Sequence, residues 1–196
     1  MQYNLHTSLG NALNGAEHVI SCFCVDFPLA RMRDREVCNR HGVYPREGET
    51  MTPGGLMATL RHLPILLDTC REMERRCPDA FLQIINNPLA RLCDGVHRHA
   101  RIRFVGHCHG ITHTRVELAK AMGLDPNDVE VIAAGVNHLT FILELRDRRT
   151  GENLLPRIPQ TLNRILQEGP FGFRFSNLVY KLVGYYPSPG DNHIAD

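Results

Sequence analysis

The sequence has almost no net charge and no long apolar run, and both absences limit what the protein can be. Its 22 lysines and arginines are nearly balanced by 21 aspartates and glutamates. A balanced surface offers no broad positive patch, so we expect neither nucleic acid nor a membrane as a partner. No apolar run approaches the roughly 20 residues of a membrane-spanning helix, and the first residues lack the pattern of a signal peptide. We therefore expect a cytoplasmic protein with a small-molecule ligand.

The cysteines also lack the pattern of a disulfide scaffold. There are seven, an odd number, and they are scattered through apolar surroundings. Small secreted scaffolds instead carry paired cysteines at regular spacings, so most of these residues are interpreted as buried free thiols. The 196 residues, with 43% hydrophobic and 22% charged content, indicate a soluble globular chain with a proper core.

Apolar patterns typical of strands alternate with patterns typical of helices. Four strands are predicted at 16–25, 81–86, 102–106 and 129–134, and a strand-like run at 139–145 indicates an antiparallel piece. The intervening helices are predicted to begin near Pro53, with a kink at Pro64, after Asn87-Pro88, and at a capping box formed by Thr114 and Glu117. This alternation predicts an α/β fold with a largely parallel sheet, whose ligands bind at the carboxyl ends of its strands.

Three polar clusters follow predicted strands, at Asn86-Asn87, His107–His109 and Asn137-His138. Cys108 and His138 offer a thiolate and an imidazole, which together can hold a divalent metal, with zinc as suitable as any other. Taken alone, a cysteine at a strand end is more often a small core residue. His107 and His113 are interpreted as surface or loop histidines.

Short motifs along nearly the whole chain resemble those of the family-4 glycoside hydrolases, in the family's order. They are Cys24 to Gly42, Pro53-Gly-Gly55, Arg61-x-x-Pro64, Cys77-Pro-Asp-Ala80, Asn87-Pro88, Val105-Gly-x-Cys-His109, Ala134-Gly-x-Asn-His138 and Gly184-Tyr-Tyr-Pro187. The resemblance implies a Rossmann-like fold similar to lactate and malate dehydrogenases. It also implies a glycosidase that requires NAD and a divalent metal, usually Mn²⁺, a known exception to two-carboxylate hydrolysis.

The mechanism implied by the resemblance is a transient oxidation of the sugar. Hydride leaves C3 for NAD, a base removes the C2 proton, the aglycone at C1 is eliminated, and water addition with hydride return reverses the sequence. A metal at O2 and O3 would polarise the ketone. We expect residues 1–135 to be part of an NAD-binding domain and residues 136–196 to begin an α+β substrate domain.

The resemblance also assigns roles to individual residues. Cys108 and His138 match the metal ligands, and Asn87 matches an asparagine near the nicotinamide and the sugar, although it could equally cap a helix. Asn137 is expected to bind sugar or to orient His138. His109 could donate a proton or bind sugar hydroxyls.

Substrate and base are assigned through the same resemblance. The Cys108-His109-Gly110 sequence is more like that of members acting on α-linked uronic acids, and Arg31 is a candidate clamp for the carboxylate, or else a solvated arginine. Candidates for the base are Tyr186, which is preferred, Tyr185 and Asp191. A tyrosine would need its pKa lowered from about 10. Each tyrosine could equally be an aromatic residue packed at a strand end.

The largest departure from the family is a missing glycine-rich turn. Members begin with a strand and a G-x-G element that binds the NAD pyrophosphate, and none precedes Ala16. We therefore expect an internal segment of a longer homo-oligomeric enzyme, inactive alone and without tight NAD binding. The alternatives are a dehydrogenase of the lactate or malate type, and a non-catalytic segment that binds metal or serves in assembly.

Overall fold

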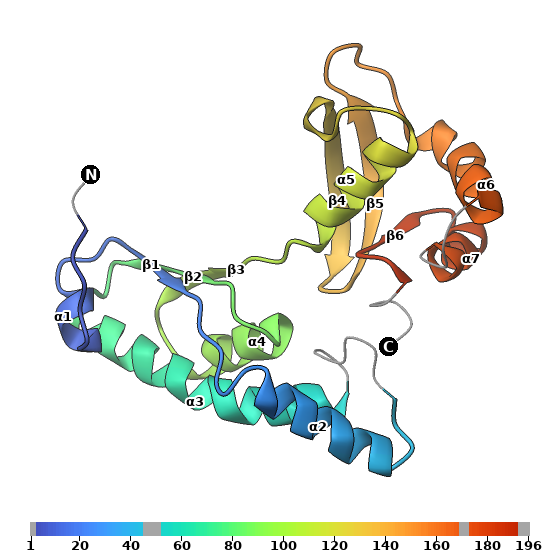
Figure 1. The fold of residues 1–196 in the computed structure, drawn as a ribbon. Helices are drawn as coiled ribbons and strands as arrows, with labels where there is room; N and C mark the ends of the chain where they lie inside the picture. Colours follow the sequence, from blue (N-terminus) through green and yellow to red (C-terminus); the bar gives the residue numbers. More distant parts are fainter. Residues whose placement is uncertain (1–2, 45–51, 169–172, 192–196) are drawn as a thin grey trace. The chain divides into compact units, whose positions relative to one another are not determined.

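The computed structural model describes residues 3–44, 52–168 and 173–191, which form two compact units. The first unit is Met1–His107 and the second is Cys108–Asp196 (Figure 1). The break between them comes earlier than the boundary after residue 135 that the sequence led us to expect. No helix of the described chain is long and apolar enough to cross a membrane.

The first unit contains a parallel sheet of three strands in the order β1-β2-β3. Its strands are β1 (His18–Ser21), β2 (Phe81–Ile84) and β3 (Arg103–Gly106). The helices are α1 (Leu9–Leu13), α2 (Leu29–Arg40), α3 (Pro53–Arg76) and α4 (Leu89–His99). The connection from β2 through α4 to β3 is the crossover that a parallel pair requires, so the predicted α/β fold is confirmed.

The core of the first unit lies between the sheet and the long helix α3. Leu66, Cys70 and Met73 lie at spacings of four and three residues along α3 and are fully buried, as are Leu82 and Ile84 on β2. The helix begins where Thr52 Oγ1 accepts a hydrogen bond from Gly55 N at 3.3 Å, and it continues through Pro64. Burial of this apolar stripe packs α3 along one face of the sheet (Figure 1).

The second unit is built on an antiparallel sheet in the order β4-β5-β6. Its strands are β4 (Val129–Val136), β5 (Leu139–Asp147) and β6 (Tyr186–Ser188), and its helices are α5 (Gly110–Ala121), α6 (Ile158–Glu168) and α7 (Arg174–Val183), with short 3₁₀ turns at Pro126–Asp128 and Leu155–Arg157. The buried side chains of Leu118, Ile142 and Leu145 form the centre of its core.

Two expectations for this unit are wrong. The strand predicted at 129–134 does not extend the parallel sheet but pairs antiparallel with β5, because two residues between the strands are too few for a crossover. The expected capping box at Thr114 and Glu117 lies inside α5, which begins at Gly110. Thr114 is buried, and its hydroxyl bonds Ser188 Oγ at 2.7 Å, which ties α5 to β6.

Candidate functional site

Cys108 and His138 come together in the second unit, as the sequence analysis expected of a metal pair. Cys108 lies two residues before the start of α5 at Gly110, and His138 lies in the two-residue turn between β4 and β5. The turn is strained, because His138 has φ 64°, a left-handed conformation that non-glycine residues rarely adopt. Gly135 on β4 has φ 145°, and a Cβ there would come within 2.5 Å of the Leu139 carbonyl oxygen. Only glycine fits this approach to the turn.

Hydrogen bonds lower the pKa of the Cys108 thiol below its usual value. The largest cause is the hydrogen bond with His138, and burial partly opposes it. Gly110 N, which lies 3.5 Å from the sulfur, and the Asn137 side chain lower the pKa further. The lowered pKa favours the thiolate form of Cys108, which is the form that binds metals and acts as a nucleophile.

The neighbouring Asn137 offers a third donor atom. Its Oδ1 is buried without a hydrogen-bond partner. Such a buried acceptor lowers the stability of the fold unless a ligand binds to it. A thiolate and an imidazole fit a divalent transition metal that keeps open positions for substrate, and the unpaired amide oxygen beside them can contact a ligand. Among the described residues there is no cluster of three or more histidines, cysteines or carboxylates that could hold a metal ion.

The residues proposed as the base lie after α7, in three different environments. Tyr186 is buried on β6, and burial, followed by the charge of Glu117, raises the pKa of its hydroxyl. Tyr185 is half exposed. Asp191 Oδ1 and Oδ2 accept hydrogen bonds from Ser176 N at 2.8 Å and Phe175 N at 3.0 Å, at the start of α7. The environment of Tyr186 opposes the lowered pKa that a tyrosine base needs.

The segment with these residues passes close to Cys108. A Cβ built on Gly110 would meet the Pro189 ring at 2.8 Å and the Cys108 sulfur at 3.5 Å. His109 is exposed at the position before α5, and its side chain makes no capping hydrogen bond. The second unit thus gathers the proposed metal ligands, His109 and the start of α5 within one small region.

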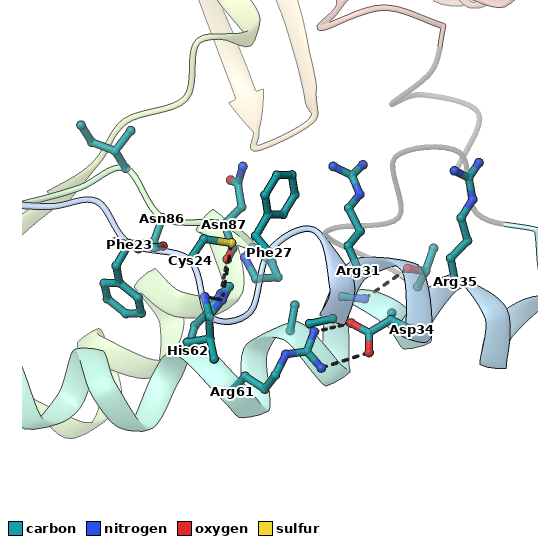
Figure 2. Close-up of a pocket in the computed structure, with 18 of the residues that line it drawn as sticks. Phe23, Cys24, Phe27, Arg31, Asp34, Arg35, Arg61, His62, Asn86 and Asn87 are labelled. Carbon is teal, nitrogen blue, oxygen red and sulfur yellow. Dashed lines mark hydrogen bonds and ion pairs between the residues drawn. The ribbon is translucent and has the colours of Figure 1, made fainter.

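The other expected site residues, Arg31 and Asn87, line one pocket in the first unit. The pocket has a volume of about 360 Å³ and lies between α2, the start of α3, and the loops that follow β1 and β2 (Figure 2). Arg35 lies one helical turn after Arg31 and extends in the same direction. Asn87 is not the helix cap considered from the sequence, because Pro88 holds that position before α4 and no side chain caps it.

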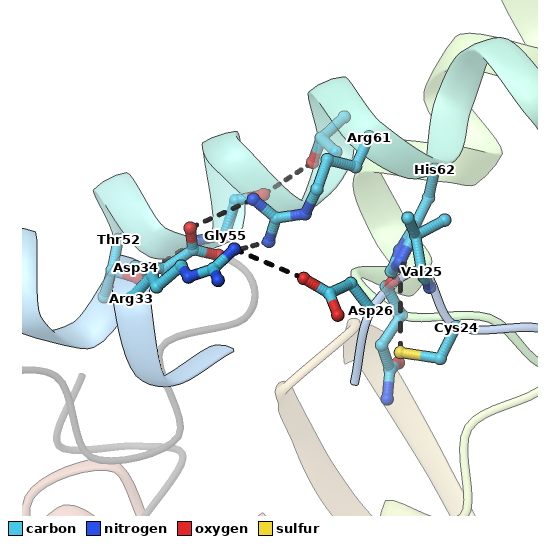
Figure 3. A network of polar contacts seen from close by, with 11 residues as sticks. Cys24, Val25, Asp26, Arg33, Asp34, Thr52, Gly55, Arg61 and His62 are labelled. Carbon is cyan, nitrogen blue, oxygen red and sulfur yellow. Dashed lines mark hydrogen bonds and ion pairs between the residues drawn. The ribbon is translucent and has the colours of Figure 1, made fainter. Parts of the chain in front are cut away.

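Buried polar contacts fix the walls of this pocket (Figure 3). Arg61 on α3 donates two hydrogen bonds to Asp34 on α2, one of them Nη1 to Oδ1 at 3.0 Å. The bonds raise the pKa of the Arg61 guanidinium, and this bidentate pair joins the two helices. Asn86 is also buried, and it accepts from Ser21 Oγ and donates to the Phe23 carbonyl, both at 2.6 Å.

Sequence reasoning placed Asn86 in a polar cluster but gave no role to four other pocket residues, namely Asp34, Arg35, Arg61 and His62. All four lie within quoted motifs, Asp34 and Arg35 in the stretch from Cys24 to Gly42, and Arg61 and His62 in the Arg61-x-x-Pro64 element. Even so, His62 carried no signal of its own, since its partners are main-chain atoms far away in the sequence. His107 and His113 make surface contacts, to Gln83 Oε1 at 3.1 Å and to Glu117 at 3.4 Å.

Comparisons with solved structures support the same fold. The Bacillus subtilis protein lplD has a TM-score of 0.83 at 24% identity, over 96% of this chain and 48% of that one. A 6-phospho-alpha-glucosidase from gut microorganisms, in complex with NAD and Mn²⁺, has a TM-score of 0.77 at 17% identity, over 94% of this chain and 44% of that one. Lactate dehydrogenase from Eimeria maxima has a TM-score of 0.54 at 18% identity, over 93% and 51%. The likeness to the dehydrogenase confirms the expected Rossmann-like fold.

Curated relatives are glycosidases. The alpha-galactosidase of Bacillus subtilis (strain 168) is 30% identical over 94% of this chain and 42% of its own length. The alpha-glucosidase of Erwinia rhapontici is 33% identical over 75% of this chain and 33% of its own length. The alpha-galacturonidase of Thermoanaerobacter italicus is 26% identical over 100% of this chain and 47% of its own length. The chain spans less than half the length of these relatives. The model of family 4 glycosyl hydrolases matches residues 1–124, and the chain therefore belongs to this family.

Proposed function

We propose that this chain contributes the metal-binding part and a substrate-binding pocket to an NAD- and Mn²⁺-dependent glycosidase acting on α-linked sugars. The observation that supports it best is the Cys108 thiol, whose pKa is lowered by the hydrogen bond with His138, next to the unpaired Asn137 Oδ1, in a member of this family. When bound, NAD would accept and return a hydride at sugar C3, and the metal would polarise the oxidised sugar.

The residues of the second unit then hold the metal and move protons. Cys108 and His138 bind the metal, and Asn137 binds the sugar or orients His138. Exposed His109, next to the metal cysteine, donates a proton toward the leaving oxygen or bonds a sugar hydroxyl. The base remains Tyr186, Tyr185 or Asp191. The exposure of Tyr185 and the raised pKa of Tyr186 favour Tyr185 of the two tyrosines.

The first unit would orient the sugar. Asn87 contacts sugar or nicotinamide, and Arg31 binds an acidic substituent, with Arg35 one turn away. Paired arginines suit a carboxylate because the guanidinium binds it in a bidentate way. A uronic acid is the proposed sugar, in line with the galacturonidase among the relatives.

Metal binding provides the first test. Titration with Co²⁺ should produce a thiolate-to-cobalt charge-transfer band in the ultraviolet, and Cys108→Ser should abolish it. His138→Gln should weaken it, whereas Cys93→Ser, which changes a partly buried thiol of the first unit, should leave it intact. An unchanged band in Cys108→Ser would refute the metal assignment.

Activity provides the second test. The enzyme containing this chain should release aglycone from an aryl α-galacturonide only with both NAD and Mn²⁺, and Cys108→Ser should abolish this release. A plain dehydrogenase would oxidise a hydroxy acid without metal and release no aglycone. Failure to release aglycone from α-galacturonide, α-galactoside or α-glucoside, despite bound metal, would favour the non-catalytic alternative.

A further inference from the structure

His62 on α3 connects two loops of the first unit through its imidazole ring. The side chain is buried, with 4% exposure. Its Nδ1 lies 2.7 Å from the carbonyl oxygen of Asn87, and its Nε2 lies 3.1 Å from the amide nitrogen of Val25. Val25 follows β1 and Asn87 follows β2, so one ring contacts the main chain after two adjacent parallel strands (Figures 2 and 3).

The chemistry of these partners determines the tautomer of His62. A carbonyl oxygen can only accept a hydrogen bond, so Nδ1 must carry the proton that it donates to Asn87. An amide N–H can only donate, so Nε2 must be unprotonated and accept from Val25. The Cys24 sulfur, 3.9 Å from Nε2, is a weaker additional contact. A neutral imidazole thus satisfies both loops at once.

The two connected loops form one side of the pocket. Residues 22–25 and 85–88 contribute to its lining, together with His62 itself. Phe23 packs edge-on against the imidazole, with 5.7 Å between ring centroids, which further limits rotation of the ring. Since the ring nitrogens of an imidazole lie at fixed positions, the ring sets the separation of the loops at this point.

We propose that His62 is a positioning residue that holds Asn87 in place against the loop after β1. The role of Asn87 toward ligand rests on the proposed function, whereas the connection between the loops does not. Misplacement of a substrate-contacting group by about 1 Å can cost as much as 100-fold in rate. Loss of the ring contacts should therefore affect turnover more than folding.

Three variants separate positioning from a purely structural role. His62→Phe retains a ring of similar size without its hydrogen bonds, and His62→Gln retains a donor and an acceptor. Leu66→Ala is the control, because Leu66 lies one turn further along α3, is fully buried and does not line the pocket. All three variants are measured well below their melting temperatures, so that each is folded during the comparison.

The first measurements need no ligand. Long-range ¹H–¹⁵N correlation should show the Nδ1–H tautomer of His62 in the wild type. Amide hydrogen exchange at Val25 should be at least about tenfold faster in His62→Phe than in Leu66→Ala, and largely restored in His62→Gln. An Nε2–H tautomer, or equal Val25 exchange in His62→Phe and Leu66→Ala, would overturn the proposal.

Glycosidase kinetics then test the consequence for the site. With an aryl α-galacturonide, NAD and Mn²⁺, kcat should fall about tenfold or more in His62→Phe and less than about twofold in Leu66→Ala, with partial rescue by His62→Gln. Equal kcat in His62→Phe and wild type would contradict positioning of Asn87. If the wild type itself releases no aglycone, the proposed function fails, while the tautomer and the exchange data still decide the role of His62.

Discussion

The two units place cysteine thiols in opposite electrostatic settings. In the first unit, burial raises the pKa of Cys70 to about 11 and also raises the pKa of Cys93. In the second unit, the hydrogen bond with His138, together with those from Gly110 and Asn137, lowers the pKa of Cys108. The difference shows that hydrogen-bond donors around the sulfur, rather than the residue type, distinguish the proposed metal ligand from a core thiol.

The polar groups of the two units differ in a related way. In the first unit, His62 and Asn86 bond main-chain atoms of neighbouring loops and thereby define the shape of a pocket. In the second unit, the buried Oδ1 of Asn137 has no partner. We interpret the polar groups of the first unit as fixing the shape of a binding pocket, and the unpaired Asn137 oxygen of the second unit as available to a ligand.

Removal of Asp34 should have the largest effect on the first unit. In Asp34→Ala, the Arg61 guanidinium loses its partner in a partly buried position, which should cost about 3 kcal/mol of unfolding free energy. Urea denaturation measures the change. Asp94→Ala, which removes the exposed pair with Arg98 on α4, is the matched control and should have little effect. A similar small loss in both variants would mean that the Asp34 pair does not stabilise the pocket.

Replacement of Gly135 should disturb the turn of the second unit. In Gly135→Ala, the new methyl group meets the Leu139 carbonyl, and the positive φ adds strain, for a loss of about 2 kcal/mol. The free energy of unfolding, measured by urea denaturation, should fall. The affinity for Co²⁺ should fall as well, because His138 shifts. Gly151→Ala, whose added methyl meets no atom, should lose only the smaller cost of its φ of 73°. Unaltered Co²⁺ affinity in Gly135→Ala would separate the turn from the metal pair.

Local patterns predicted most of the first unit. The apolar runs of β1, β2 and β3 and the start of α3 near Pro53 follow from local pattern. The buried face of α3 does not, because Leu56 and Leu60, which share the apolar spacing of its first turns, are exposed. β4 was assigned to the wrong sheet because an apolar run does not encode its pairing direction. That direction is set by the short Asn137-His138 turn, which sequence reasoning treated only as a binding cluster.

The site residues that short sequence motifs identify could be predicted, whereas the residues placed by contacts with distant parts of the chain could not. Cys108 and His138 were named from their local context, and the structure brings them together. For Tyr186 the sequence left two alternatives, a base or an aromatic residue packed at a strand end. Its burial, which depends on the pairing of Tyr186 with Ile142 across β5 and β6, favours the second. His62 was missed, since its bonding partners lie 37 and 25 residues away.

The contrast between the thiols can be measured by alkylation. At pH 7 to 8, iodoacetamide should modify Cys108 several-fold faster than Cys93, because only the thiolate reacts and the two pKa values are shifted in opposite directions. Peptide mass spectrometry gives the rates. As the pH is lowered, Cys108 should keep its reactivity longer. His138→Phe should remove much of that advantage, and equal pH profiles for the variant and the wild type would show that His138 is not the cause.

The smallest expected effect concerns Glu117 on α5. Burial, the largest cause, and the charge of Asp191 raise the pKa of its carboxyl, while His113 lowers it. Because the folded state holds this proton more tightly than the unfolded state, the group stabilises the fold at low pH and loses that contribution as the pH rises through the folded pKa. Glu117→Gln should therefore gain stability relative to wild type between pH 4 and pH 8, by about 0.3 kcal/mol once solvent screening of this partly exposed group is allowed for. Thermal melts across this range measure the difference, and a gain that shrinks with rising pH would show that the ion pair with His113 outweighs burial.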